Sequence, residues 1–510
     1  MKNKIFFCIG LLIILALGII HSWLGWHTFE WDGDTAIMAL LDLGGWHPVI
    51  ISWILKFTYF FTGYHIYTFL LLQIIPFYLA LFIFVWAIYS KWHSIWSLAL
   101  LLPFFTIQFY IMPLQLMSTS FSAIWIFLLY SLVLYGVLNP EFKHRWTKWS
   151  YCTIVGILFI IALLSRYNAI VQVWPITIIG IGLYLNKKEL KTWSYLWRLG
   201  VCSFFSGLIC IGLVIGLNKA LIRTELGGVY PANAMFLGQI TGSCIPKMDK
   251  TCFDDEWWTE DWIVKKDKMQ ELKRVYERIP TNSDVLYASW HPNPAFVFYK
   301  ELKGLHQKWF YAITKYPNNY FKHLSRYYDV MWHKKWNKRY FLNERVYDPA
   351  QFENISYGAH PHSRREISER RKIAKKFNFD ELRFYWGEKE KSVVEYVIKY
   401  TFLPETIWMV YFNFILFLVA FVLWLFKRKN TFILYFLCVS IAGSLSNLII
   451  PVFTSLTLSR YLYPIYLFAT IGFCLFVVLL CLQLPYLKNF IANRKKMLLN
   501  SKTKNKKAKK

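Results

Sequence analysis

Carboxylates are missing from long stretches of the sequence. It holds 58 Lys and Arg residues but only 30 Asp and Glu residues. No acid lies between Asp42 and Glu141, between Glu189 and Glu225, or after Glu405. Apolar runs fill these stretches, and 56% of all residues are hydrophobic, against about 45–50% in an average soluble chain. The absences exclude a soluble globular protein and indicate helices that face lipid.

The formal net charge of +28 would suit a nucleic-acid partner, but the placement of the basic residues excludes that reading. Many of them stand in short loops and tails beside apolar runs, where Lys and Arg orient a membrane protein. The positive-inside rule then predicts a multi-pass protein of the plasma (inner) membrane, with both termini cytoplasmic. The loop residues on this inner face are Lys91, Lys143, His144, Arg145, Lys148, Lys187, Lys188, Lys191, Lys427, Arg428 and Lys429.

The apolar runs predict a polytopic α-helical membrane protein with about ten transmembrane helices, since a helix needs about 20 apolar residues to span the hydrocarbon core. Residues 1–218 would form an N-terminal transmembrane module with its first external loop at 24–64. Residues 404–485 would form the C-terminal transmembrane helices, and 486–510 a basic cytoplasmic tail. The runs lie at about 5–23, 66–90, 94–112, 117–138, 150–165, 169–186, 200–218, 405–426, 430–450 and 461–482.

The polar segment 219–403 is predicted to be an extracytoplasmic domain, because nearly all the remaining acids lie in it. Long loops cross the membrane largely regardless of their charge, and this one is long enough to fold. Helical patterns at Glu260–Arg278 and Pro294–Lys315 predict a mixed, mostly helical fold. Cys244 and Cys252 have seven residues between them. Outside the cytoplasm they could form a disulfide; two free surface thiols are the alternative.

Three carboxylates stand within five residues at the start of the first external loop: Glu30, Asp32 and Asp34. Such neighbours repel one another and stay ionised only when hydrated, paired with cations or bound to metal. In an extended segment Asp32 and Asp34 share one face, and Gly33 permits a sharp turn between them. The cluster suits a general base acting on an acceptor hydroxyl or amine. A solvated loop whose acids cap the next helix is the alternative.

Two arginines, Arg166 and Arg460, are predicted at the outer membrane boundary, each beside a Tyr. An Arg in this position can bind phosphate oxygens through two hydrogen bonds. It can also simply extend into the headgroup region beside an aromatic belt. His47, which precedes Pro48, could bind a phosphate or only cap the helix that follows.

Taken together, these motifs resemble the GT-C superfamily of membrane glycosyltransferases. That superfamily includes the polyprenyl- and dolichyl-phosphate-mannose-dependent mannosyltransferases and the aminoarabinose transferases, and bacterial relatives of these look most similar. The resemblance rests on the acidic first loop followed by His47-Pro48 and an apolar stretch. It also rests on Ser165-Arg166-Tyr167-Asn168, on Tyr316-Pro317-Asn318-Asn319-Tyr320, and on Ser459-Arg460-Tyr461-Leu462-Tyr463-Pro464.

The resemblance implies a GT-C-like fold and a transferase that moves sugar from a polyprenyl-phosphate donor, usually with inversion, to a glycan, lipid or protein acceptor on the outer face. Many relatives carry a second acidic motif in the next external loop, whereas Met112–Ser118 has no charge here. This departure weakens a metal site built from two carboxylates; no metal ligand is assigned, and a divalent cation stays open as a cofactor. The implied catalytic residues are Asp34, then Asp32; the implied substrate-binding residues are Glu30, His47, Arg166, Asn168, Arg460 and Tyr461.

Two other functions remain open from the sequence. A lipid-linked sugar flippase or transporter is the main alternative, although transporters commonly place ionisable residues inside their spans. The acid-free spans disfavour proton coupling but leave passive lipid movement open. A surface-polysaccharide polymerase or ligase is the second alternative, and for it an acidic first loop is less expected.

Overall fold

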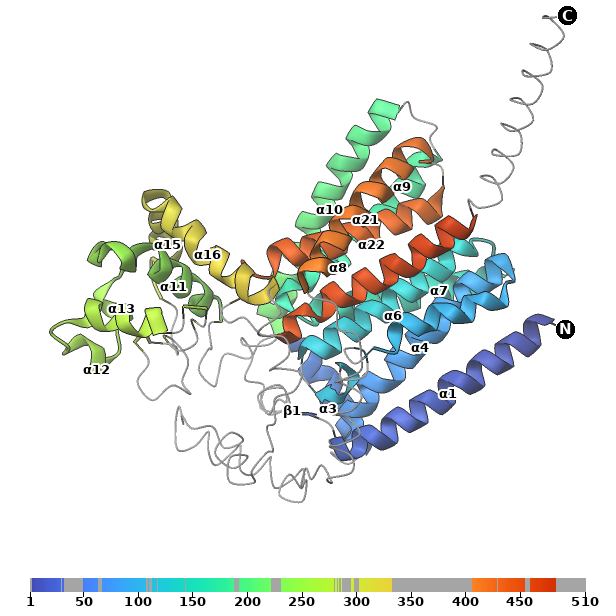
Figure 1. Cartoon of the computed structure of the whole chain (residues 1–510), viewed down its shortest axis with the longest axis horizontal. Helices are drawn as coiled ribbons and strands as arrows, with labels where there is room; N and C mark the ends of the chain where they lie inside the picture. Colours follow the sequence, from blue (N-terminus) through green and yellow to red (C-terminus); the bar gives the residue numbers. More distant parts are fainter. Residues whose placement is uncertain are drawn as a thin grey trace, which may run out of the picture.

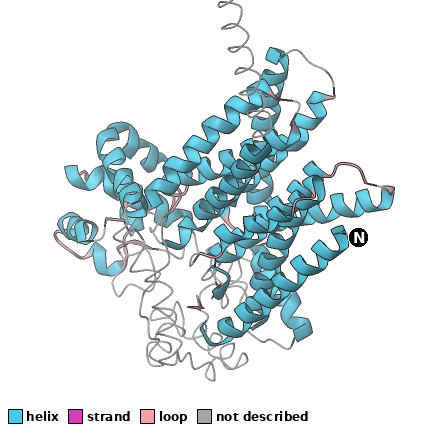
Figure 2. Cartoon of the chain, turned by 45° about the vertical axis from the view of Figure 1, so that its right-hand side comes forward, coloured by secondary structure: helices cyan, strands magenta, loops and turns pink. Residues whose placement is uncertain are grey.

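The computed structural model describes about two thirds of the chain, and nearly all of that part is helical (Figure 2). The predicted tail at 486–510 and most of the second half of the segment 219–403 lie outside the described residues. The described residues are 2–28, 30–31, 49–62, 67–106, 109, 112–116, 118–142, 144–187, 192–221, 231–278, 280–281, 283, 286, 295–297, 302–332, 406–428, 430–454 and 459–482.

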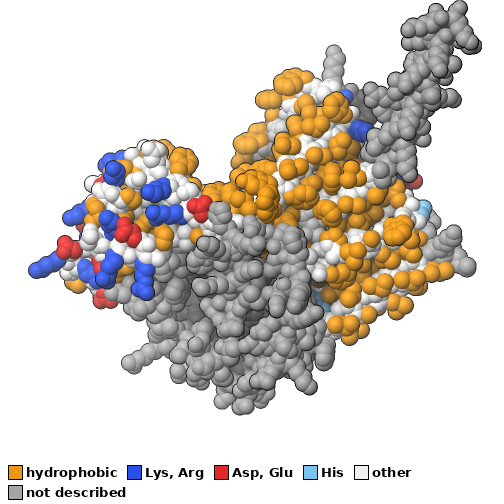
Figure 3. Space-filling view, in the orientation of Figure 1, with side chains coloured by type: hydrophobic (Ala, Val, Ile, Leu, Met, Phe, Trp, Pro, Cys, Tyr) orange, Lys and Arg blue, Asp and Glu red, His pale blue; other side chains and the backbone are white. Residues whose placement is uncertain are grey.

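Within these residues, nine helices are long and apolar enough to cross a membrane. The chain is therefore a polytopic helical membrane protein, and apolar side chains cover the flank of the bundle that the helices form (Figure 3). The spanning elements are α1 (Lys2–Thr28), α4 (Tyr67–Trp92), α6 (Ser118–Leu138), α7 (Arg145–Leu164), η3 (Tyr167–Ala169) continued by α8 (Ile170–Val173) and α9 (Pro175–Asn186), α10 (Thr192–Leu221), α21 (Thr406–Phe426), α22 (Thr431–Ile449) and the helix Tyr463–Leu482. The shorter apolar helix α3 (Val49–Thr62) lies within the segment predicted as the first external loop.

The predicted span at 94–112 is not an α-helix of spanning length. Its first part, Ile95–Phe104, is the 3₁₀ helix η1, and a further short 3₁₀ turn, η2, covers Met112–Leu114. Two prolines explain the difference, since Pro103 and Pro113 lack the amide proton that an α-helix needs and clash with the preceding turn.

This irregular segment still crosses the bundle, because it runs antiparallel to α4 along the length of that helix. The ring of Phe104 lies 5.9 Å from that of Phe84. Further along, the carbonyl of Pro113 accepts a hydrogen bond of 2.9 Å from Gln73, near the start of α4. A 3₁₀ helix rises about 2.0 Å per residue against 1.5 Å in an α-helix, so fewer residues cover the same depth.

The described residues between 231 and 332 form a separate lobe at one end of the bundle (Figure 1). Its helices are α11 (Pro231–Cys244), α12 (Glu260–Ile263), α13 (Lys268–Arg278), α15 (Leu305–Lys315) and α16 (Pro317–Trp332). The helical pattern over Glu260–Arg278 corresponds to two separate helices, α12 and α13. α15 begins later than predicted: its N-cap, Gly304, has φ +75°, a left-handed conformation in which a helix cannot continue upstream.

The lobe has its own apolar core, which contains three tryptophans. Trp257, Trp258 and Trp262 are almost completely buried, and the rings of Trp258 and Trp262 stack with their centres 5.9 Å apart. Trp257 also donates its indole N–H to the carbonyl of Lys303 at 3.0 Å. These aromatic residues therefore hold the lobe together.

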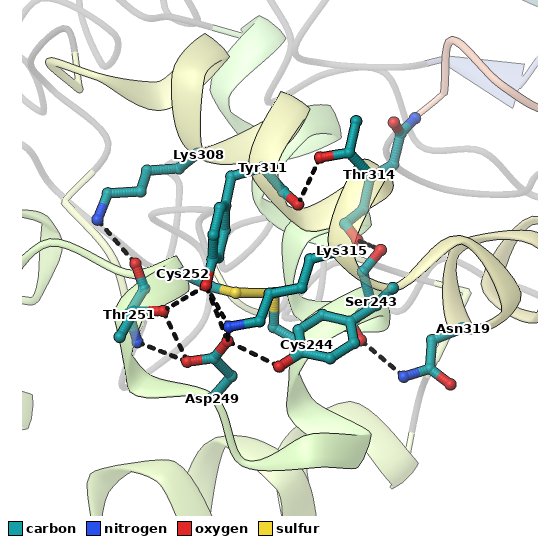
Figure 4. The surroundings of a disulfide bond; sticks show 12 residues. Ser243, Cys244, Asp249, Thr251, Cys252, Lys308, Tyr311, Thr314, Lys315 and Asn319 are labelled. Carbon is teal, nitrogen blue, oxygen red and sulfur yellow. Dashed lines mark hydrogen bonds and ion pairs between the residues drawn. A yellow bond between two sulfur atoms is a disulfide. The ribbon is translucent and has the colours of Figure 1, made fainter.

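A disulfide between Cys244 and Cys252 closes the chain at the end of α11, with the two Cα atoms 6.5 Å apart (Figure 4). The first of the two alternatives for these cysteines is thus confirmed. Inside the closed loop, the Asp249 carboxylate accepts hydrogen bonds from the Tyr316 hydroxyl at 2.8 Å and the Lys315 ammonium at 3.0 Å. The loop therefore ties the end of α11 to the corner between α15 and α16.

The lobe is also attached to the bundle. Gln239 of α11 donates to the carbonyl of Val452 at 2.8 Å, and Tyr328 of α16 donates to the carbonyl of Leu448 at 2.5 Å. The start of α1 and the end of Tyr463–Leu482 lie at the opposite end of the bundle from the lobe (Figure 1). Which side of the membrane each of these ends faces stays a prediction from the basic loops.

Candidate functional site

The predicted site residues divide into three groups. Asp32, Asp34 and His47 lie outside the described residues. Glu30 and Arg460 are placed by their backbone, in the short strand β1 (Glu30–Trp31) and the 3₁₀ helix η9 (Ser459–Leu462). The structure describes the side chains of the last group, which are Arg166, Asn168 and Tyr461.

Arg166 connects three elements at the lobe end of the bundle. It follows the last turn of α7 in extended backbone, and its guanidinium lies 5.0 Å from the centre of the Tyr461 ring in η9. The guanidinium also donates a hydrogen bond to the hydroxyl of Thr119 in α6. A cation over an aromatic face is attracted by the ring quadrupole. The two contacts therefore hold the half-buried guanidinium in one orientation.

The first turns of α6 add hydroxyl groups beside this arginine. Ser118, Thr119, Ser120 and Ser122 are all buried at the start of this spanning helix. Ser165, the residue before Arg166, donates to the Ser122 hydroxyl at 2.7 Å. The N-terminus of a helix carries partial positive charge and favours anions. The arginine, the hydroxyls and the end of α6 therefore suit a bound anion such as a phosphate.

A pair of two-residue strands brings the start of the first loop close to the start of α6. β1 pairs in parallel with β2 (Gln115–Leu116), with Glu30 opposite Gln115. Successive Cα atoms are about 3.8 Å apart, so the backbone of Gln115 lies within about 11 Å of Ser118. The acidic segment that starts at Glu30 thus begins beside the hydroxyl-rich end of α6, although the sequence separates the two by more than 80 residues.

Tyr461 joins this site to the lobe. It packs against an apolar cluster in which the end of α16 meets the bundle. The same helix η9 carries Arg460 directly before Tyr461. Asn168, in η3, lies half-buried two residues after Arg166. The members of the cluster around Tyr461 are Met331, Trp332, Met409, Ile450, Leu462, Ile465 and Tyr466.

A second polar group lies inside the lobe and is separate from Arg166. His323 is almost completely buried and shares a hydrogen bond of 2.8 Å with the Tyr276 hydroxyl. Arg326 donates to the same hydroxyl at 3.3 Å. Burial, reinforced by the charge of Arg326, lowers the pKa of His323 to about 3. Burial also raises the pKa of Tyr276 to about 12, although the charge of Arg326 opposes it. Both groups are therefore neutral at physiological pH and support the fold.

In the described part of the chain, no three His, Cys, Asp or Glu side chains converge in a way that could hold a metal ion. Asp32 and Asp34 of the acidic cluster lie outside that part, so a divalent cation stays a prediction. Thr119 and the neighbouring serines were not singled out from the sequence. The run Ser118-Thr119-Ser120-Phe121-Ser122 at the start of an apolar span is the signal that could have identified them.

Comparison of the chain with protein-family models, with curated proteins and with solved structures found no match. The function therefore has to be argued from the site itself.

Proposed function

We propose that this protein is a membrane glycosyltransferase that takes sugar from a polyprenyl-phosphate donor. The observation that carries the proposal is the meeting of Arg166, Tyr461 and the hydroxyl-rich start of α6 beside the strand that opens the acidic first loop. A lipid-phosphate sugar needs a cationic site for its phosphate at the membrane boundary and a base for the acceptor nearby. Arg166 and the hydroxyls beside it are proposed for the phosphate, and the strand pairing that brings Glu30 near them supports this.

In the proposed reaction, the donor phosphate binds at Arg166 and the start of α6. Asp34, or Asp32 in its place, removes the proton from an acceptor hydroxyl or amine. The acceptor atom then attacks the anomeric carbon, and the bond from that carbon to the phosphate oxygen breaks. The polyprenyl phosphate leaves with one more negative charge than the donor carried. Arg166 stabilises that charge as it develops.

The alternative of a flippase has no observation in its favour among the described residues. The buried polar groups near Arg166 lie at one end of the bundle, and no Asp or Glu lies in any of the nine spanning helices. A proton-coupled transporter commonly needs such a group within its spans.

The test is release of polyprenyl phosphate from radiolabelled polyprenyl-phosphate sugars by purified protein, with a membrane extract as the source of acceptor. Wild-type protein should show turnover that depends on the acceptor. Asp34→Asn should lower it by roughly 10²-fold or more, the scale of losing a general base. Asp42→Asn, which changes an acid outside the three-residue cluster, is the matched control and should keep wild-type turnover.

Other outcomes count against specific parts of the proposal. Equal turnover in Asp34→Asn and wild type would remove Asp34 from the site and move the role to Asp32. Movement of the lipid carrier across liposomes without any sugar transfer would replace the enzyme with a flippase.

A further inference from the structure

The exposed surface of α16 has two edges of different chemistry. Residues seven and eleven positions apart fall on one side of a helix, so Phe321, Tyr328 and Trp332 share an aromatic edge. The other exposed edge is charged. Its residues are Lys322, Arg326 and Asp329. The buried face of α16, on the other side of the helix, consists of His323, Leu324, Tyr327 and Met331.

The two edges face different surroundings. On the charged edge, Arg326 donates to the Tyr276 hydroxyl of α13 at 3.3 Å, within the lobe. On the aromatic edge, Tyr328 donates to the carbonyl of Leu448, at the last turn of α22. Because α22 is a spanning helix, this bond places the aromatic edge at the depth where the bundle leaves the membrane.

Phe321 continues that edge beyond the bundle. It lies seven residues before Tyr328, which is about 10.5 Å along an α-helix, and α16 runs away from the bundle in this direction (Figure 1). Its side chain is 65% exposed, and Leu448 at the contact point is 42% exposed on the bundle flank. Phe321 thus presents a largely exposed ring, in contact with the ring of Tyr320, on the same edge of α16 as Tyr328.

We propose that α16 is an interfacial helix whose aromatic edge, led by Phe321, is inserted into the lipid leaflet on the lobe side of the membrane. Lipid is the occupant that the geometry favours, because any spanning protein is surrounded by it at the depth of Leu448. An interfacial helix buries its apolar edge at the boundary between headgroups and acyl chains and keeps its charged edge in water. The two edges of α16 have that arrangement, and the proposal stands whether or not the protein transfers sugar.

The experiment places the photoreactive residue p-benzoylphenylalanine at position 321 of the full chain in phosphatidylcholine nanodiscs. Irradiation followed by mass spectrometry of the peptides measures the yield of phospholipid adducts. Lys322 is the matched control, because it is the next residue on the same helix, lies about 100° around it and is exposed. Phe204, 62% exposed on the spanning helix α10, is the reference for full lipid contact.

We expect the substitution at Phe321 to give adducts within about threefold of the Phe204 reference, and the substitution at Lys322 at least tenfold fewer. Low yields at both α16 positions would overturn the proposal, since the helix would then stand clear of the bilayer. High yields at both would overturn it too, because neither edge would then face water. Phe321 is exposed, so its replacement should leave the elution of the purified protein in size-exclusion chromatography unchanged, which shows that the variant is folded.

Discussion

The guanidinium of Arg166 lies 5.0 Å from the centre of the Tyr461 ring. One residue ends the fourth spanning helix and the other precedes the last, so the contact joins the two halves of the bundle at its lobe end. Thr119 accepts a hydrogen bond from the same guanidinium, which adds the start of α6. A charge held from two sides in this way is oriented before any ligand arrives, and such preorganisation is what an anion site needs.

The first prediction concerns donor binding at Arg166. Arg166→Lys keeps the charge but loses the planar group that can bind two phosphate oxygens. A hydrogen bond to a charged group contributes about 1.5–3 kcal/mol, so the KM for the polyprenyl-phosphate donor should rise by roughly 10- to 100-fold. Steady-state kinetics at varied donor concentration measure this.

Arg198→Lys is the matched control for that experiment. It makes the same change at an exposed position of α10, so the KM for the donor should stay within about threefold of wild type. A wild-type KM in Arg166→Lys would take the phosphate site away from this arginine.

The Arg166–Tyr461 contact also shows what the sequence could predict. Each residue could be found from its position at the end of an apolar run, because run length and flanking Tyr indicate a membrane boundary. Nine of the predicted spans could be found in the same way, and the spacing of Cys244 and Cys252 left a disulfide open. These are all features of local sequence.

What sequence reasoning missed depends on contacts between distant residues or on local backbone geometry. Nothing in the local sequence pairs Glu30 with Gln115, so the approach of the acidic segment to α6 could not be predicted. The burial of Thr119 beside Arg166 is non-local in the same way. The α-helix predicted at 94–112 was wrong for a local reason. Hydropathy does not register that Pro103 lacks the amide proton that an α-helix needs.

A second prediction follows from the burial of His323. Its pKa in the folded lobe is about 3, against about 6.5 in an unfolded chain. Above pH 6.5 the ring is neutral in both states. As the pH falls from 6.5 towards 3, only the unfolded state takes up the proton, so the lobe should lose stability by about 1.4 kcal/mol per pH unit. Thermal unfolding midpoints at pH 7.5, 6.0 and 5.0 measure the loss.

The comparison with two variants isolates this histidine. His323→Gln should lower the midpoint at pH 7.5 but flatten its fall between pH 6.5 and 5.0, a range in which most carboxylates stay ionised. His306→Gln, at an exposed position of α15, should keep the wild-type slope. An unchanged slope in His323→Gln would mean that this ring does not control the acid sensitivity.

A third prediction concerns the packing of α11 on α16. A Cβ atom added at Gly242 would overlap the imidazole of His323, which is itself buried. Gly242→Ala should therefore lower the unfolding midpoint of the lobe, by an amount equivalent to about 1–3 kcal/mol for an overpacked site. At Gly212, in α10, an added Cβ meets nothing within 4 Å. Gly212→Ala should be neutral or slightly stabilising, because Ala favours a helix over Gly by about 1 kcal/mol. Equal effects of the two substitutions would contradict the close approach of the two helices.

The fourth prediction treats the disulfide and Asp249 as one unit, because both hold the same loop (Figure 4). Burial alone would raise the pKa of Asp249, but hydrogen bonds from Thr251, Lys315 and Tyr316 outweigh it and hold that pKa well below its usual range. A lowered pKa means that the carboxylate stabilises the lobe above about pH 4 and that this contribution is lost as the pH falls further. Asp249→Asn should thus lower the unfolding midpoint at pH 7, and the difference from wild type should shrink in acid.

Removing the disulfide by Cys244→Ala with Cys252→Ala should cost about 2–3 kcal/mol, the amount expected for a short closed loop. When the disulfide removal is combined with Asp249→Asn, the total loss of stability should be smaller than the sum of the two separate losses. The reason is that a carboxylate in an open loop is no longer held against Lys315 and Tyr316. Asp255→Asn is the control, since Asp255 pairs with Lys268 at the lobe surface and its loss should add independently to that of the disulfide. Full additivity between the disulfide and Asp249 would contradict this, because it would show that the carboxylate keeps its hydrogen bonds without the covalent bond and that the two stabilise the lobe independently.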